Sequence, residues 1–107
     1  MKLITIGSSS KGNSYALQSD SGEILLIEAG IHLREVKKTI GYKTSKVVGC
    51  IVSHVHGDHA KYIPEYLKAG ISVSSNDEVA EKYPGVDTIY ENITYRFGSF
   101  GVTPFPV

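Results

Sequence analysis

Two runs of consecutive apolar residues stand out in the hydrophobic pattern of this 107-residue chain. Ile24-Leu25-Leu26-Ile27 lies within a predicted strand over residues 23–28, and Cys50-Ile51-Val52 lies within a second predicted strand over residues 46–53. A strand that is apolar on both faces is typical of a sheet that is covered on both sides. We therefore expect these two strands near the centre of the fold.

Apolar residues at helical spacing follow both runs. They predict three helices: residues 32–40, which end before Gly41; a helix that starts at Pro64 and ends at Gly70; and a helix that Asn76 caps and that extends to residue 81. Proline suits the first turn of a helix, and glycine suits the position after its end. Helices of this length are expected to cover the sheet.

Shorter apolar segments predict the remaining strands, over residues 2–6, 14–18, 71–74, 86–90, 93–97 and 100–105. Small residues over 7–13 predict a loop, and Asp20-Ser21-Gly22 predicts a tight turn. The order is a β-hairpin, then strands that alternate with helices, then a second hairpin. This order predicts a single α/β domain over residues 1–107.

Charge and cysteine content narrow the class of protein further. Lys+Arg and Asp+Glu both number 11, so the formal net charge is zero and no general nucleic-acid-binding surface is indicated. Cys50 is the single cysteine, so no internal disulfide can form, and its apolar neighbours predict that it is buried. The apolar run after Met1 is too short for a signal peptide or a membrane span. We expect a cytoplasmic protein without membrane association.

Potential metal ligands gather directly after the second buried strand, in the segment His54-Val55-His56-Gly57-Asp58-His59. His54 and His56 are two residues apart, so an extended backbone turns both imidazoles to the same side. We interpret Gly57 as the residue that permits a sharp turn and brings Asp58 and His59 back to the same cavity. Imidazole nitrogen and carboxylate oxygen are ligands that zinc and similar ions accept. Four such donors suit two metal ions about 3.5–4 Å apart, which together activate a water for hydrolysis.

A polar surface loop is the plain alternative to this metal site. Three of the four histidines fall within one turn beside an aspartate, which is uncommon outside metal and catalytic sites. His32 is isolated at a predicted helix start, and we interpret it as an ordinary capping or surface histidine. The glycine- and serine-rich segment 7–13 can either cradle a phosphate or simply connect two strands. We favour a connection near the mouth of the site that is anchored by Asn13.

The histidine motif resembles the HxHxDH signature of the metallo-β-lactamase superfamily. Two other segments are similar to that family in order and spacing: residues 7–15 and Leu26-Ile27-Glu28-Ala29-Gly30. The resemblance implies the N-terminal half of an αβ/βα sandwich, with a mixed sheet and flanking helices. Gly12-Asn13-Ser14 is similar to the YycJ/WalJ-like branch, whose members resemble metal-dependent nucleases or phosphodiesterases.

The resemblance also implies a role for each polar residue of the motif. His54 and His56 would bind a first metal ion, and Asp58 and His59 would bind a second. Asp58 would also lie beside the attacking water and act as a catalytic residue. The implied metal is zinc, and manganese is the alternative.

Two further residues are expected to support the ligands instead of binding the metal. Glu28 stands where the family usually has an aspartate that orients the ligand loop, and glutamate is one methylene longer. Asn13 is the second supporting residue. Residues of this kind hydrogen-bond the ligands and hold them in position.

The full domain of the family is longer than this chain, and its remaining ligands come from later in the sequence. No histidine follows His59, so each metal ion would have two protein ligands, whereas a catalytic zinc usually has three. We expect a fragment, a site completed by the missing C-terminal half or by a second copy in a homodimer, or a scaffold without catalysis. The first hypothesis is a metal-dependent hydrolase that acts on phosphodiesters or nucleic acid. The alternative is a non-catalytic half-domain that binds metal or a partner.

Overall fold

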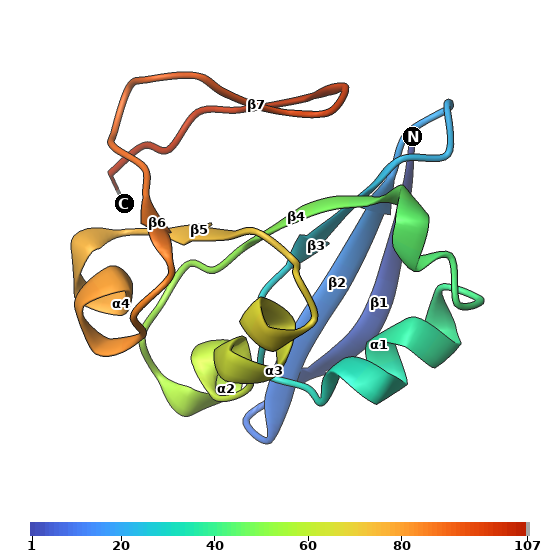
Figure 1. Cartoon of the computed structure of the whole chain (residues 1–107), viewed down its shortest axis with the longest axis horizontal. Coiled ribbons are helices and arrows are strands. Elements are labelled where there is room, and N and C mark those ends of the chain that lie inside the picture. Colours follow the sequence, from blue (N-terminus) through green and yellow to red (C-terminus); the bar gives the residue numbers. More distant parts are fainter. Residues whose placement is uncertain (107) are drawn as a thin grey trace.

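A six-stranded mixed sheet forms the centre of the computed structural model, which describes residues 1–106. Its strands lie side by side in chain order: β1 (Lys2–Ser9), β2 (Gly12–Gln18), β3 (Ile24–Ile27), β4 (Val47–Ile51), β5 (Val73–Ser75) and β6 (Asp87–Thr88). The first three strands pair antiparallel, and β3 to β6 pair parallel (Figure 1). The α/β fold with a mixed sheet is confirmed.

Helices connect the parallel strands, as the spacing of apolar residues predicts. They are α1 (Leu33–Thr39), the 3₁₀ helix η1 (Thr44–Lys46), α2 (Gly57–Ala60), α3 (Ile63–Lys68) and α4 (Asp77–Lys82). Pro64 lies in the first turn of α3, and the Asn76 side chain accepts a hydrogen bond from the backbone N–H of Val79 at the start of α4. All three predicted helices are confirmed, with ends that shift by one or two residues.

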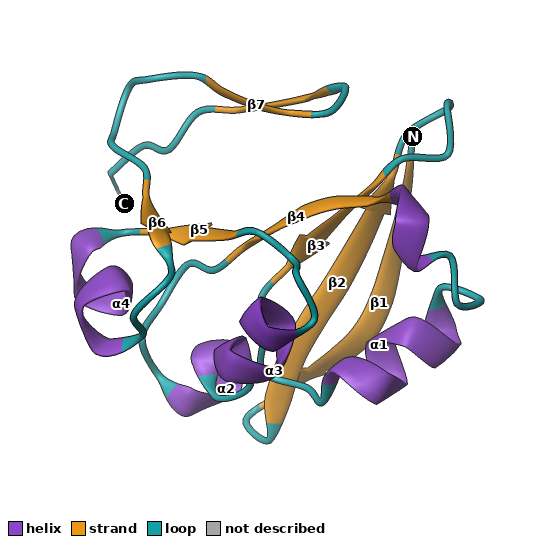
Figure 2. Cartoon of the chain, in the orientation of Figure 1, coloured by secondary structure: helices purple, strands orange, loops and turns teal. Residues whose placement is uncertain are grey.

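The hydrophobic core lies between the large sheet and these helices, which flank the same side of the sheet (Figure 2). Alternate residues of β3, Ile24 and Leu26, point into this core and are 1% exposed. Cys50 on β4 is fully buried there, as predicted. The other members of the core come from both layers: Ala16, Ala29, Leu33, Val36, Ile40, Val52, Ala60, Ile63, Tyr66, Val73, Val79 and Val86.

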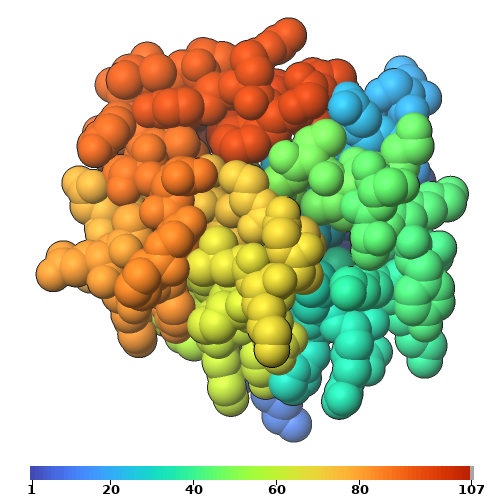
Figure 3. Space-filling model, viewed as in Figure 1, coloured from blue at the N-terminus to red at the C-terminus, as the bar shows by residue number. Residues whose placement is uncertain are grey.

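The opposite face of the sheet is also apolar, and a small hairpin covers part of it. This hairpin consists of β7 (Tyr95–Phe97) and β8 (Phe100–Val102). The backbone N–H of Ser99 donates to Glu23 Oε1, so the hairpin tip lies against the β2–β3 turn, as the space-filling view shows (Figure 3). A cavity of about 430 Å³ remains between the two layers and is lined by, among others, Leu17, Leu25, Ile27, Ile51 and Phe100. Burial of the β3 run on both faces is thereby explained.

The predicted loop over residues 7–13 is wrong. β1 continues to Ser9 and β2 begins at Gly12, so the two strands form a tight hairpin. Strands pair through backbone groups, so small residues such as these can form a hairpin. Gly7 and Gly12 also allow another segment of the chain to pack closely on it. A Cβ at Gly7 would lie 2.2 Å from the Ile31 side chain, and a Cβ at Gly12 would lie 2.3 Å from the Gly30 carbonyl oxygen. The Gly30 backbone therefore crosses Gly12 at a distance that only glycine allows, and the end of the Ile31 side chain packs directly on Gly7.

Among residues 1–106, no helix has both the length and the apolar character that crossing a membrane requires.

Candidate metal centre

The carboxyl ends of three parallel strands meet at one edge of the sheet, and the polar residues of interest follow them. Glu28 comes directly after β3, Ser53 and His54 come after β4, and Asn76 comes after β5. Asn76 Nδ2 donates to the Ser53 carbonyl oxygen over 3.4 Å, which links two of these loops. The edge formed by strand carboxyl ends is the usual place for binding sites in α/β folds.

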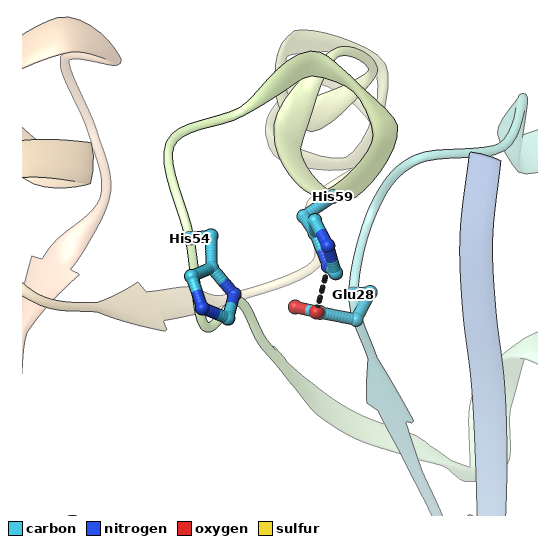
Figure 4. Close-up of side chains that lie close together, drawn as sticks. All are labelled: Glu28, His54 and His59. Atoms are coloured by element: carbon cyan, nitrogen blue, oxygen red, sulfur yellow. Dashed lines mark hydrogen bonds and ion pairs between the residues drawn. The ribbon is translucent and has the colours of Figure 1, made fainter. Parts of the chain in front are cut away.

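Glu28, His54 and His59 converge at this edge. Each offers a ligand atom, and these atoms all lie within 4.8 Å of one another. The rings of His54 and His59 have centroids 4.8 Å apart and are tilted by 47°. Figure 4 shows the Glu28 carboxylate below the His59 ring and beside the His54 ring, with His59 on α2 and His54 on the loop after β4. Two imidazoles and a carboxylate form a donor set that suits a divalent metal ion.

Glu28 has a backbone conformation that glutamate rarely adopts. Its φ is 70°, in the left-handed region, and the residue is only 5% exposed. A non-glycine residue pays a conformational cost of about 1–2 kcal/mol there, and such residues cluster at functional sites. The left-handed turn ends β3 and aims the carboxylate across the edge of the sheet.

Three donors surround the Glu28 carboxylate. Oε1 accepts the backbone N–H of Ser53 over 2.7 Å, and Oε2 accepts the Ser53 hydroxyl over 2.6 Å. Oε2 also contacts His59 Nδ1. The buried carboxylate is thus satisfied by hydrogen bonds, as a buried charge requires. Burial raises the pKa of the neighbouring Cys50 thiol, and the Glu28 charge raises it further.

His56 and Asp58 lie at the border of the cluster. The His56 ring is nearly parallel to that of His54, with centroids 6.4 Å apart, and its backbone carbonyl accepts the N–H groups of the first turn of α2. Asp58 Oδ2 lies 3.4 Å from His59 Nε2. Neither residue belongs to the group whose ligand atoms share the 4.8 Å limit. The four residues of the motif therefore do not all converge equally in this structure.

Asn13 contacts the ligand loop from the β1–β2 hairpin. Its side-chain Nδ2 donates to both the backbone oxygen and Oδ2 of Asp58, each over 3.2 Å. The same nitrogen lies 3.1 Å from the Ser9 carbonyl oxygen and so ties the hairpin tip to α2. β2 runs antiparallel to β3, which places the start of β2 at the edge where β3 ends.

The backbone of residues 29–30 is held between the hairpin and α2. Ala29 N–H donates to the His59 carbonyl over 2.7 Å, and Gly30 N–H donates to the Asn13 carbonyl over 3.1 Å. A Cβ at Gly30 would lie 1.9 Å from the Asp58 carbonyl oxygen, so glycine is required here. At Gly57 an added Cβ would meet only Lys61 Cβ, at 4.0 Å, and φ is not positive. The chain turns into α2 at Gly57, as interpreted from the sequence, but neither the space nor the φ at this position requires glycine.

Ser53 is a polar residue of the site that sequence reasoning missed. Its hydroxyl lies 2.6 Å from Glu28 Oε2 and 2.6 Å from His54 Nδ1, between the carboxylate and the ring. Its position directly before His54, at the strand exit, is the sequence signal that could have identified it. His32, in contrast, lies outside the cluster: its Nδ1 is 2.9 Å from Glu65 Oε2 and its ring packs on Tyr62. It stands at the first position before α1 but makes no side-chain cap.

The chain is therefore an α/β protein whose mixed sheet carries a histidine–carboxylate cluster, a candidate metal centre, beyond the ends of its parallel strands. A sequence model described as "Metallo-beta-lactamase superfamily" matches residues 9–104, so the chain belongs to that superfamily. Comparison with curated proteins gives no match.

Solved structures of the superfamily share this fold. The crystal structure of BLEG-1, a B3 metallo-beta-lactamase, has a TM-score of 0.73 at 13% identity and covers 94% of this chain and 58% of its own. SMB-1 in complex with mercaptoacetic acid has a TM-score of 0.71 at 16% identity, over 98% and 52% of the two chains. A metallo-beta-lactamase from Pontibacter korlensis has a TM-score of 0.63 at 16% identity, over 91% and 57%. This chain therefore spans slightly more than half the length of these solved chains.

Proposed function

We propose that this chain binds a divalent metal ion through His54 and His59, beside the Glu28 carboxylate, and provides the metal-binding part of a hydrolase. The observation that carries the proposal is the convergence of these three side chains, with ligand atoms within 4.8 Å, beyond the ends of β3 and β4. Zinc is the metal that the donor types favour, and manganese is the alternative. Membership of the metallo-beta-lactamase superfamily supports the same chemistry.

The residues present fit a metal ion in a defined way. His54 and His59 would supply imidazole nitrogens, and His56 and Asp58 are the neighbouring residues that would complete the ligand set. Glu28 would act through hydrogen bonds, because its two oxygens already accept donors from Ser53 and His59. A bound divalent ion would supply Lewis acidity and make a water more acidic, so that it can attack an ester, an amide or a phosphodiester.

A phosphodiester is the substrate class that we propose. Support comes from the β1–β2 hairpin, whose Gly-Asn-Ser segment resembles the YycJ/WalJ-like branch of phosphodiesterases and nucleases. Asn13 of this hairpin contacts Asp58, so the hairpin tip lies beside the proposed metal ligands. In this proposal Asp58 holds the attacking water, and Asn13 holds Asp58.

A second candidate function is a half-domain that binds metal or a partner without catalysis. Two observations favour it: the chain spans only 52–58% of the solved chains reported above, and His54 and His56 are exposed. A zinc ion with three protein ligands and a water is the usual catalytic arrangement, and further ligands from elsewhere would be required for it. The two candidates share metal binding and differ in turnover.

Calorimetric titration of the 107-residue chain with zinc tests metal binding. We expect a dissociation constant in the micromolar range or below for the unsubstituted chain. His54→Ala and His59→Ala should each weaken binding by at least about tenfold, since each removes a direct donor. His32→Ala is the matched control, because His32 contacts Glu65 outside the cluster, and it should bind zinc as the unsubstituted chain does. Equal affinity in all four proteins would reject the proposed site.

Hydrolysis of bis(p-nitrophenyl) phosphate by the zinc- or manganese-loaded chain separates the two candidate functions. Turnover that is lost in Asp58→Asn and His56→Ala but kept in His32→Ala supports the hydrolase. Tight zinc binding without turnover supports the non-catalytic half-domain.

A further inference from the structure

The Ser53 hydroxyl occupies the space between a buried carboxylate and an imidazole. It lies 2.6 Å from Glu28 Oε2 and 2.6 Å from His54 Nδ1. Both distances are typical of short hydrogen bonds that involve a charged or strongly polar partner. The hydroxyl has one proton and two lone pairs, so it can donate to only one of these neighbours.

The proton of Ser53 must lie toward Glu28. A carboxylate only accepts hydrogen bonds, and two oxygens 2.6 Å apart without a proton between them would repel each other. The backbone N–H of Ser53 reaches the other oxygen, Oε1, over 2.7 Å and fixes the carboxylate in this orientation. The lone pairs of the hydroxyl are then left to face His54 Nδ1, which has to carry a proton.

We propose that Ser53 is a positioning residue that connects the Glu28 carboxylate to His54 by hydrogen bonds. It keeps the neutral His54 ring in the tautomer protonated at Nδ1. The lone pair of Nε2 is then free to bind a metal ion. Glu28 Oε2 contacts Nδ1 of His59 directly, so the same oxygen orients both imidazoles, one directly and one through Ser53. Fixing the tautomer of a metal-binding histidine through its second nitrogen is a general way to raise metal affinity.

Only the expected effect on metal binding rests on the proposed function. The tautomer of His54 can be measured without metal. The experiment uses the ¹⁵N-labelled chain after treatment with a chelator, at alkaline pH, so that the rings are neutral. Long-range ¹H–¹⁵N spectra of the imidazoles report which nitrogen carries the proton. His54 is assigned by the signals that disappear in His54→Ala.

We expect Nδ1–H at His54 in the unsubstituted chain and a mixture of both tautomers in Ser53→Ala. Ser53→Thr should restore Nδ1–H, because it keeps the hydroxyl and Ser53 is exposed, with room for a methyl group. In calorimetry, Ser53→Ala should bind zinc about 10- to 100-fold more weakly, and Ser53→Thr should bind it as the unsubstituted chain does. Far-UV circular dichroism checks that both variants are folded.

The results distinguish this inference from the proposed function. A folded Ser53→Ala chain that keeps the unsubstituted His54 signals and zinc affinity overturns the role of Ser53 and leaves the metal site standing. An unsubstituted chain that shows Nδ1–H at His54 but binds no zinc supports the tautomer and overturns the proposed function.

Discussion

Replacement of Gly30 by alanine should destabilise the fold and the candidate metal centre together. The added Cβ would lie 1.9 Å from the carbonyl oxygen and 2.5 Å from the carbonyl carbon of Asp58, and 2.7 Å from the backbone nitrogen of Asn13. All three neighbours are backbone atoms, so no side-chain rotation relieves the overlap. Either α2 or the β1–β2 hairpin must retreat by about 1 Å, and close-packed interiors resist such shifts.

The expected loss of unfolding free energy is about 2–4 kcal/mol. Overpacking of this kind costs about 1–3 kcal/mol. The shift also stretches the hydrogen bond from Gly30 N–H to the Asn13 carbonyl, which adds about 1 kcal/mol. A domain of this size has a total stability of about 5–15 kcal/mol, so the variant should remain folded at low temperature. Its thermal midpoint should fall by roughly 10–25 °C.

Urea unfolding followed by far-UV circular dichroism measures this loss. Gly57→Ala is the matched control, because Gly57 begins α2, the helix that Gly30 contacts. Its added Cβ meets only Lys61 Cβ, at 4.0 Å. We expect its stability to stay within about 0.5 kcal/mol of the unsubstituted chain or to rise slightly, since alanine favours helix more than glycine does. Equal midpoints for Gly30→Ala and Gly57→Ala would refute the close approach of residue 30 to α2.

Three other predictions concern residues outside the cluster. The Leu33 backbone N–H, with a smaller effect of His32, lowers the pKa of the Glu65 carboxyl in the folded chain. The charged Glu65 carboxylate therefore stabilises the fold fully above its ordinary pKa of 4.5, and this stabilisation is lost as the pH falls through the lower folded-state pKa. Urea midpoints should therefore show a gap between the unsubstituted chain and Glu65→Gln at pH 6 that narrows below about pH 4.5; a constant gap would contradict the shift. Cys50, which is buried and has a raised thiol pKa, should react with Ellman's reagent at least about 1000-fold more slowly in the folded chain than in urea; comparable rates would show that the thiol is accessible. Asn76→Ala should lower the unfolding free energy by about 1 kcal/mol, because it removes the cap of the Val79 N–H, while Asn76→Asp should retain most of it in the same urea assay.

The periodicity of apolar residues predicts the three longest helices and the strands, but not the ends of these elements and not the short helices η1 and α2. The β3 run Ile24–Ile27 was recognisable because both of its faces are buried. The strand pairing of Ser8 and Ser9 with the start of β2 was not recognisable, because their side chains contribute little to a hydrophobic pattern. Residues 30–31 pack against Gly7 and Gly12 of this hairpin, and that tertiary contact leaves no periodic pattern in the sequence.

Only part of the candidate site can likewise be predicted from the sequence. His54, His56, Asp58 and His59 are neighbours in sequence, so their clustering alone indicated a metal site. The partners that orient them come from elsewhere in the chain: Asn13 is 45 residues from Asp58, and Glu28 is 31 residues from His59. Spacing along the chain carries no information on such contacts. The left-handed φ of Glu28, which directs its carboxylate, cannot be predicted from the sequence either, because glutamate rarely adopts this conformation.

Metal binding and folding are linked through the contacts that position the ligand side chains. The backbone hydrogen bonds between Ala29 and His59 and between Gly30 and Asn13 join protein groups to one another, and so do the contacts of Glu28 with Ser53 and His59. Contacts within the folded protein at the sheet edge therefore help to orient the imidazoles. In a small zinc finger, in contrast, the ion itself assembles the ligands and the metal-free chain is unfolded. Here an ion that prefers the folded state would add RT ln(1 + [L]/Kd) to a fold that the sheet, the helices and the Glu28 contacts already hold together.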